Sequence, residues 1–232
     1  TLNAADGITL STGLTTSVAT TGTTITIDAD SDNNAESTAT FVITDAGSLN
    51  TSTDDLTITA ADVNLNDSGT ITATGGTVTL LASTGVDLGL GADATFELDD
   101  EGLANITAGN LILGDYTGSI TVTGIDEPES DNISGTVTLR GTSITFTDAT
   151  TFNALDVEAN DRISVQGNLT TDTGALALDG DFGDAAGTND DIVLSAGITL
   201  ASETSLTLDA TTGGITASGA ITLNAKAGVT IN

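Results

Sequence analysis

The chain repeats a three-residue unit in which a threonine stands between two apolar residues. Clear examples are Ile25-Thr26-Ile27, Leu56-Thr57-Ile58, Val78-Thr79-Leu80, Leu206-Thr207-Leu208 and Val229-Thr230-Ile231. Apolar residues at alternate positions are the pattern of a short β-strand with one buried face. Gly, Asn, Asp or Ser separates most units from the next. The pattern therefore predicts many short strands joined by tight turns.

The spacing of these units predicts coils. Three strands fill the interval from Asn64 to Asp87, the interval from Thr207 to Thr230 is equally long, and that from Thr121 to Thr145 is longer by a single position. All three fall within the range of about 20–30 residues that is typical of strand-containing solenoid repeats. We therefore expect an all-β protein, a parallel β-helix (β-solenoid) with about three short strands per coil and about ten coils.

A β-sandwich or barrel is the competing fold. Its strands average about 5–6 residues and its hairpins favour Asn-Gly or Asp-Gly turns. Here the apolar cores are shorter, and although Asp6-Gly7 and Asp179-Gly180 occur, most turns have other compositions. Strands too short for hairpins are better explained by hydrogen bonds to the coils above and below.

Four stretches interrupt the rhythm and are rich in acidic residues, Gly or Asn: residues 28–40, 92–105, 125–133 and 179–191. Insertions in a solenoid emerge at its turns, so we expect these stretches to project as loops. Phe41-Val42-Ile43 is expected to return to the core after the first of them. No linker divides the chain, so residues 1–232 are expected to form a single solenoid segment.

The two ends of the chain resemble each other. Residues 1–10 (TLNAADGITL) and residues 222–231 (TLNAKAGVTI) are identical at six of ten positions. This similarity suggests one period of a longer array, although any two coils of such a chain look alike. The apolar pattern also continues to both ends, without the polar terminal units that isolated solenoids need. We expect either one period of a longer repeat array or one subunit of an end-to-end fibre.

Composition and charge exclude several classes of protein. The chain is 38% hydrophobic but only 3% aromatic, which predicts a narrow core of Ile, Leu, Val and Ala. The absence of Cys and His excludes disulfides, thiolate zinc sites and histidine-dependent catalysis. Thirty-three acidic residues face three basic ones (Arg140, Arg162 and Lys226), and the resulting net charge of −30 would repel nucleic acid and anionic membranes. We expect no insertion into a membrane.

Two acidic segments are candidate Ca²⁺ sites. Asp28, Asp30, Asp32 and Glu36 alternate like the start of an EF-hand loop, but Asn33 replaces the turn glycine and Ala39 replaces the final glutamate. Asp179, Asp181 and Asp184 form the second candidate, with glycines that allow the chain to wrap tightly around an ion. Two weaker groups are Asp99-Asp100-Glu101 and the acids between Asp126 and Asp131. The alternative for each is a solvated acidic loop without an ion.

Three segments, LTLDATTGGITASGAITLNAKAGVTIN, GNLILGDYTGSITVTG and GNLTTDTGALALDGD, resemble the β-strand-repeat regions of giant bacterial surface proteins. These include filamentous-haemagglutinin-like adhesins. The resemblance covers most of the chain and is compositional. It implies a right-handed parallel β-helix, an extracellular location at the bacterial surface, a role as adhesin, stalk or matrix fibre, and no catalytic residues.

We therefore predict a structural extracellular solenoid that forms a filament, stalk or adhesin shaft by axial stacking. Its expected partners are copies of itself or adjacent repeats of the same chain, and it needs no cofactor. The alternative is a Ca²⁺-dependent adhesion or binding module that uses the acidic loops. A polysaccharide-active enzyme is disfavoured because basic and aromatic residues are scarce. An ice-binding protein is disfavoured because the Thr-x-Thr pairs keep no fixed spacing.

Overall fold

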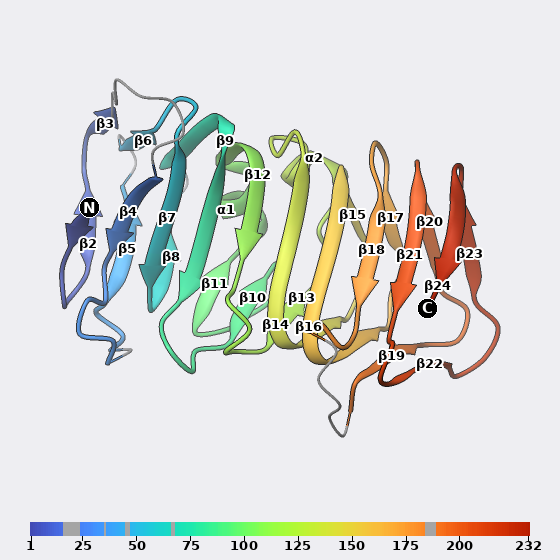
Figure 1. The fold of residues 1–232 in the computed structure, drawn as a ribbon. Coiled ribbons are helices and arrows are strands. Elements are labelled where there is room, and N and C mark those ends of the chain that lie inside the picture. Colours follow the sequence, from blue (N-terminus) through green and yellow to red (C-terminus); the bar gives the residue numbers. More distant parts are fainter. Residues whose placement is uncertain (16–23, 35, 45–46, 66–67, 184–188) are drawn as a thin grey trace.

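The computed structural model describes residues 1–15, 24–34, 36–44, 47–65, 68–183 and 189–232. The chain winds into a rod of parallel strands, with its two termini at opposite ends (Figure 1). Most coils contribute one strand to each of three faces. We name these faces A, B and C in the order in which the chain forms them. The protein is therefore a parallel β-helix with three strands per coil, as the spacing of the triplets predicts.

The strands of the three faces follow from their pairing. Face A contains β1 (Leu2–Asn3), β4 (Thr24–Asp28), β7 (Asp55–Ala60), β9 (Thr70–Ala82), β12 (Ile106–Leu113), β14 (Thr136–Phe146), β16 (Ala154–Val165), β18 (Leu176–Asp179), β21 (Ser205–Asp209) and β24 (Gly228–Ile231). Face B contains β2 (Ile8–Leu10), β5 (Thr40–Ile43), β8 (Asp62–Asn64), β10 (Leu88–Leu90), β11 (Phe96–Leu98), β13 (Ile120–Val122), β19 (Asp191–Leu194) and β22 (Gly214–Ala217). Face C contains β3 (Gly13–Thr15), β6 (Ser48–Asn50), β15 (Thr150–Phe152), β17 (Leu169–Thr171), β20 (Thr199–Ser202) and β23 (Thr222–Ala225).

One column of aliphatic side chains runs along the inside of face A. The paired residues are Leu2, Ile27, Ile58, Leu80, Leu113, Leu139, Val157, Leu178, Leu208 and Ile231. All but the first and last are buried. The threonines between the apolar residues, such as Thr57 and Thr79, are only partly buried. The triplet thus places its apolar members in the core and its threonine on the outer surface, and the ten rungs agree with the predicted number of coils.

The predicted length of one coil is confirmed at two of the three intervals. Thr207 pairs with Thr230, and Thr121 pairs with Thr145. Asn64 pairs with Val42 in the preceding coil, and on its other side β8 contacts β11, not the segment around Asp87. Coil length varies because turns differ in size. Among neighbours in the column, the number of residues from Leu80 to Leu113 is nearly twice that from Leu139 to Val157.

Four long strands continue around a corner of the rod. β9 and β12 begin on face C and end on face A, whereas β14 and β16 begin on face A and end on face B. In β9 the buried positions change from Ile71 and Ala73 to Val78 and Leu80, so the alternation slips by one residue at the corner. A one-residue slip exchanges the two sides of a strand. Gly76 occupies this corner because a Cβ there would lie 2.4 Å from the carbonyl oxygen of Asp54.

Two of the stretches predicted to be loops contain short helices. α1 (Asp100–Ala104) lies within residues 92–105 and α2 (Glu127–Ser130) within residues 125–133, and the two helices contact each other. Leu103 of α1 is fully buried, so this segment contributes to the core. Phe41 and Ile43 are also fully buried, which confirms that the chain returns to the core after residues 28–40. No described helix has the length and apolar composition needed to cross a membrane.

The stacking order on face B departs from the sequence order at one place. β11 pairs with β10 and contacts β8, whereas β10 pairs with β13. The order along the rod is therefore β8, β11, β10, β13. Parallel neighbours usually need a crossover of a dozen or more residues, but here only residues 91–95 connect the two strands.

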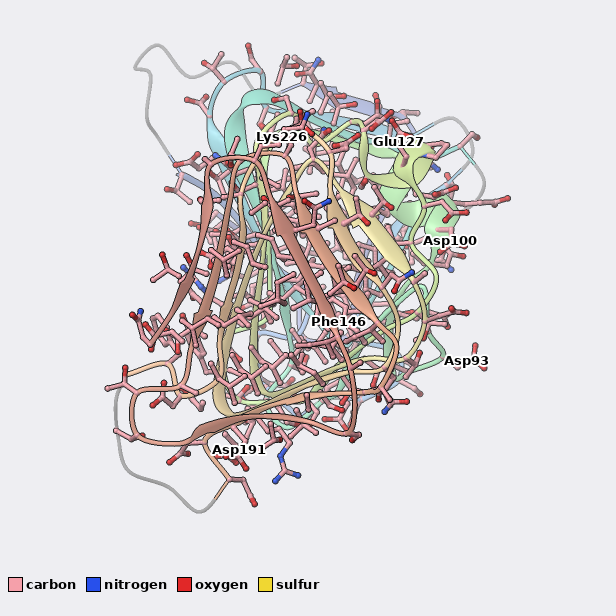
Figure 2. All side chains as sticks on the ribbon, turned by 90° about the vertical axis from the view of Figure 1, so that its right-hand side faces the viewer. Asp93, Asp100, Glu127, Phe146, Asp191 and Lys226 are labelled. Carbon is pink, nitrogen blue, oxygen red and sulfur yellow. The ribbon has the colours of Figure 1, made fainter. Side chains whose placement is uncertain are left out.

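The core is less purely aliphatic than composition predicts. Phe41, Phe96, Phe146 and Phe152 are among the largest fully buried side chains. Figure 2 shows Phe146 inside the coil, with Asp93, Asp100, Asp191 and Lys226 at its periphery. The prediction of a core of Ile, Leu, Val and Ala is therefore too narrow: Phe41 was expected to return to the core, and Phe96, Phe146 and Phe152 are buried there as well.

Candidate functional site

The first predicted Ca²⁺ segment leaves face A at the end of β4. Asp28 is partly buried, Asp30 is buried, and Asp32 and Glu36 are exposed. The Asp30 N–H donates to Asp28 Oδ1 (3.2 Å), and the Asn34 N–H donates to Asp30 Oδ1 (3.2 Å). These bonds shape the turn, a common use of aspartate in loops. Ca²⁺ binding by Asp28, Asp30, Asp32 and Glu36 stays a prediction.

The second predicted segment leaves face A at the end of β18 and repeats this local geometry. The Asp181 N–H donates to Asp179 Oδ1 (3.2 Å), and Asp181 is buried like Asp30. Burial, followed by the nearby charges of Asp181 and Asp209, raises the pKa of Asp179 to about 6. Burial would also raise the pKa of Asp181, but hydrogen bonds from Thr212 outweigh it and hold that pKa below its usual value. Asp184 lies outside the described residues.

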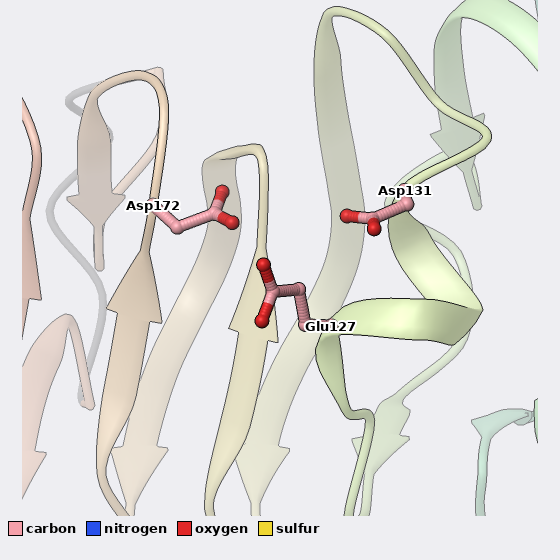
Figure 3. Close-up of side chains that lie close together, drawn as sticks. All are labelled: Glu127, Asp131 and Asp172. Atoms are coloured by element: carbon pink, nitrogen blue, oxygen red, sulfur yellow. The ribbon is translucent and has the colours of Figure 1, made fainter.

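Three carboxylates converge at α2: Glu127 and Asp131 belong to a weak candidate group predicted from the sequence, whereas Asp172 was not predicted. Glu127 at the start of α2, Asp131 at its end and Asp172 after β17 bring carboxylate oxygens within 4.8 Å of one another (Figure 3). A hydrogen bond to Asp172, and the charges of Asp172 and Asp131, raise the pKa of Glu127. All three are at least partly exposed. The stacking of successive coils could have indicated this group. Asn153, which precedes β16, donates to the Asp131 carbonyl (3.4 Å), so these two residues lie in neighbouring coils. Asp172 follows Asn153 along the chain by about one more coil.

A groove between β8 and α1 gathers further acidic residues. Asp62, Glu97, Asp99 and Glu101 line it, together with Asn105 and neighbouring residues. The Glu97 N–H donates to Asp62 Oδ1 (2.9 Å). Burial raises the pKa of Asp62, and burial together with Asp93, Asp99 and Asp62 raises the pKa of Glu97. The groove attracts cations and repels anions.

One member of this groove has a structural role. Asp99 caps α1 by accepting a hydrogen bond from the Gly102 N–H (2.7 Å). Asp100 and Glu101 in the first turn complement the helix dipole. The acidic triplet that sequence analysis listed as a weak metal candidate therefore begins a helix.

The single tyrosine of the chain anchors a cluster that spans four coils. Tyr116 stacks on Phe182, with ring centroids 5.0 Å apart, and its hydroxyl donates to Glu158. Arg140 Nε donates to Glu158 Oε2 (2.8 Å) and its guanidinium lies 5.7 Å from the centre of the tyrosine ring. Burial, then the contact with Glu158, raises the pKa of Tyr116. We call Tyr116, Arg140, Glu158 and Phe182 the aromatic clasp, because they tie β12, β14, β16 and β18 together from outside.

Replacement of Glu158 by alanine should destabilise the protein by about 1–3 kcal/mol, since Arg140 and the Tyr116 hydroxyl both lose a largely buried acceptor. Urea unfolding would measure the loss. Glu203→Ala is the matched control, because its pair with Lys226 is exposed and should matter by less than about 0.5 kcal/mol. Equal losses in the two variants would show that the clasp adds no stability.

Comparison of the chain with family models, curated proteins and solved structures found no match. The interpretation therefore depends on the geometry of the molecule. That geometry offers a rod of stacked coils and several groups of carboxylates suited to cations. It also offers end coils whose apolar residues are more exposed than those of the inner coils.

Proposed function

We propose that this protein is a structural β-solenoid that extends by axial stacking, as the shaft of a filament, stalk or adhesin at a bacterial surface. The supporting observation is the exposure of core positions at both ends. Leu2 and Ile231 belong to the aliphatic column of face A, yet they are 44% and 58% exposed. Leu14 and Val229 are also exposed. An added coil would bury all four as their inner counterparts are buried.

Hydrogen bonding supports the same proposal. Among the described strands, β1 pairs only with β4 and β24 pairs only with β21. Each therefore presents one edge of backbone N–H and C=O groups, and such edges are templates for pairing with another strand. The added coil belongs either to the same polypeptide or to a second copy. The acidic sides of the rod repel other rods laterally, which favours growth along the axis.

The stacking proposal predicts concentration-dependent, end-to-end association of the purified segment. Light scattering after gel filtration would measure mass, and negative-stain electron microscopy would show rods longer than one segment. Sodium chloride of at least 150 mM is needed to screen the charge, since the Debye length is then about 8 Å. Compact monomers at every concentration and salt level would contradict association of separate copies.

The variant Ile231→Lys should reduce association at least tenfold, because it places a charge in the axial contact. Thr230→Lys is the matched control. It makes the same change of charge one residue away, and its partner Thr207 faces the outer surface. Association that falls equally in both variants would indicate a general effect of charge.

If the coils are instead supplied by the same polypeptide, a genetic fusion of two segments should be more stable than one. A linker that completes one coil between the copies would let Leu2 of the second copy lie on Ile231 of the first, since both belong to the aliphatic column of face A. A higher urea midpoint for the fusion than for the single segment, with Ile231→Lys in the first copy removing the gain, would support covalent continuation. Identical midpoints would count against it.

A further inference from the structure

On the outer surface of face A, near the C-terminal end of the rod, acidic residues lie opposite one another on successive strands and form a ladder of like charges. The register pairs Glu158 with Asp179 and Asp179 with Asp209 on successive rungs. Adjacent strands lie about 4.7–4.9 Å apart, and like charges directly opposite each other destabilise a sheet. Arg140 on the preceding rung neutralises Glu158. Asp209 accepts hydrogen bonds from Thr211 Oγ1 (2.7 Å) and Asn232 Nδ2 (2.9 Å).

Asp181 adds a second carboxylate beside the middle of this ladder. It is only 2% exposed, and its Oδ1 has no hydrogen-bond partner although the atom is buried. It follows Asp179 by two residues, and its N–H donates to Asp179 Oδ1 (3.2 Å). An unpaired buried carboxylate oxygen is costly. The corner therefore holds two adjacent carboxylates, one of them with a buried oxygen that lacks a partner.

The position of Asp181 is fixed from both neighbouring coils. Thr212 donates to Asp181 Oδ2 through its N–H and through its hydroxyl (2.8 Å). The Gly180 N–H donates to the Asp209 carbonyl (2.9 Å), and the Phe182 N–H donates to the Ala159 carbonyl (2.8 Å). These bonds hold the Asp181 carboxylate in place while its buried Oδ1 has no partner.

The chain has no positive charge left for this corner. Its basic residues number three. Arg140 pairs with Glu158, Arg162 with Asp191, and Lys226 with Glu203. The countercharge for Asp179 and Asp181 must therefore come from solution.

We propose that Asp179 and Asp181 bind one Ca²⁺ ion. Carboxylate oxygens are hard ligands, and Ca²⁺ accepts flexible coordination completed by carbonyl groups and water, whereas Mg²⁺ demands near-ideal octahedral geometry. The ion neutralises the middle of the ladder and gives Asp181 Oδ1 a partner. It thereby joins the rung of β18 to the turn that precedes β19, which stiffens the rod at this coil. The inference does not depend on axial stacking.

Calorimetric titration of the EDTA-stripped protein with CaCl₂, in 150 mM NaCl at pH 7.5, tests the proposal. We expect a binding event of one equivalent with a Kd of about 0.1–1 mM, the range of extracellular Ca²⁺ modules. Addition of 10 mM CaCl₂ should raise the melting temperature by about 3–10 °C. Asp179→Asn should lose both responses, and its amide should donate to Asp181, so this variant should fold without Ca²⁺. Asp181→Asn should also lose both, and if it fails to fold, Asp179→Asn decides alone.

Asp6→Asn is the matched control, because it removes the same charge from an exposed position at the other end of the rod. It should keep the full response. Wild-type binding retained in Asp179→Asn would overturn the proposal, as would the absence of Ca²⁺ binding in the wild type. An equal rise in melting temperature with MgCl₂ would also overturn it, since that result indicates general screening of charge.

Discussion

Acidification from pH 7.5 to pH 5 is expected to raise the melting temperature of the metal-free protein. Within the part of the chain that the structure describes, six carboxyl groups have pKa values raised above their ordinary values: Asp62, Glu97, Asp100, Glu127, Asp156 and Asp179. Burial is the leading cause for all of them except Glu127. The folded protein therefore binds more protons than the unfolded chain in this range, and proton uptake favours folding.

The sign of the effect follows from linkage. A carboxyl group with a raised folded pKa contributes most stability below its unfolded pKa, near 4, and this contribution is lost as the pH rises through the folded pKa. For Asp179 that loss begins near its ordinary pKa of 3.8 and is nearly complete just above the folded pKa of about 6. Asp181, whose pKa is lowered, opposes the trend only near and below its ordinary value of 3.8. Relief of repulsion within a chain of charge −30 acts in the same direction as the six raised groups.

Differential scanning fluorimetry in EDTA, in steps between pH 7.5 and pH 5, would measure the trend. Sodium chloride at 1 M should flatten it, because the Debye length falls to about 3 Å. Asp62→Asn removes one half-buried carboxyl group with a raised pKa from the acidic groove. It should therefore reduce the change in melting temperature per pH unit. A melting temperature that falls steadily from pH 7.5 to pH 5 would contradict the pKa directions.

Replacement of Phe146 by alanine is expected to cost about 3–5 kcal/mol of unfolding free energy. Phe146 is fully buried at the end of β14, where its strand pairs with β13 on one side and β16 on the other. Loss of the ring would leave a cavity in a narrow core whose neighbouring coils are held in register by hydrogen bonds and cannot easily collapse into it. Chemical denaturation followed by circular dichroism would measure the loss.

Phe182→Ala makes the same substitution on the surface. Phe182 is 38% exposed and contacts Tyr116 in the aromatic clasp. Its loss should cost less than that of Phe146, because the aromatic pair contributes about 0.5–1.5 kcal/mol beyond burial and Phe182 is only partly buried. Similar costs for the two variants would mean that Phe146 does not support the core as its burial implies.

The architecture follows from local sequence because a strand's alternation is a local property. Leu206-Thr207-Leu208 shows which side is buried without reference to any other residue, and its distance from Val229-Thr230-Ile231 along the chain is the length of one coil. Phe41 was placed in the core from the sequence, whereas the other buried phenylalanines were harder to place, since five residues in 232 form no pattern of their own. The helix that begins at Asp100 was not predicted from these acidic residues, and Ca²⁺ binding by Asp99, Asp100 and Glu101 stays a prediction.

The carboxylate groups were predictable only in part. Asp179 and Asp181 are close neighbours in the chain, so their proximity follows from the sequence. Asp172 meets Glu127, and Glu97 meets Asp62, from distant parts of the sequence. The number of residues per coil varies almost twofold, so no fixed spacing in the sequence relates such pairs. Such contacts depend on the lengths of the intervening turns, which the apolar pattern does not reveal.

The reversed order of β10 and β11 has a consequence for how the rod is built. A solenoid that grows one coil at a time lays each strand on the edge left by the previous one. At β8 this rule fails, because the next strand on that face, β10, occupies the position one rung further along. The edge of β8 stays open until residues 96–98 arrive and fill the gap. On face B the first coils therefore contact the later ones through β11, which lies against β8 and pairs with β10.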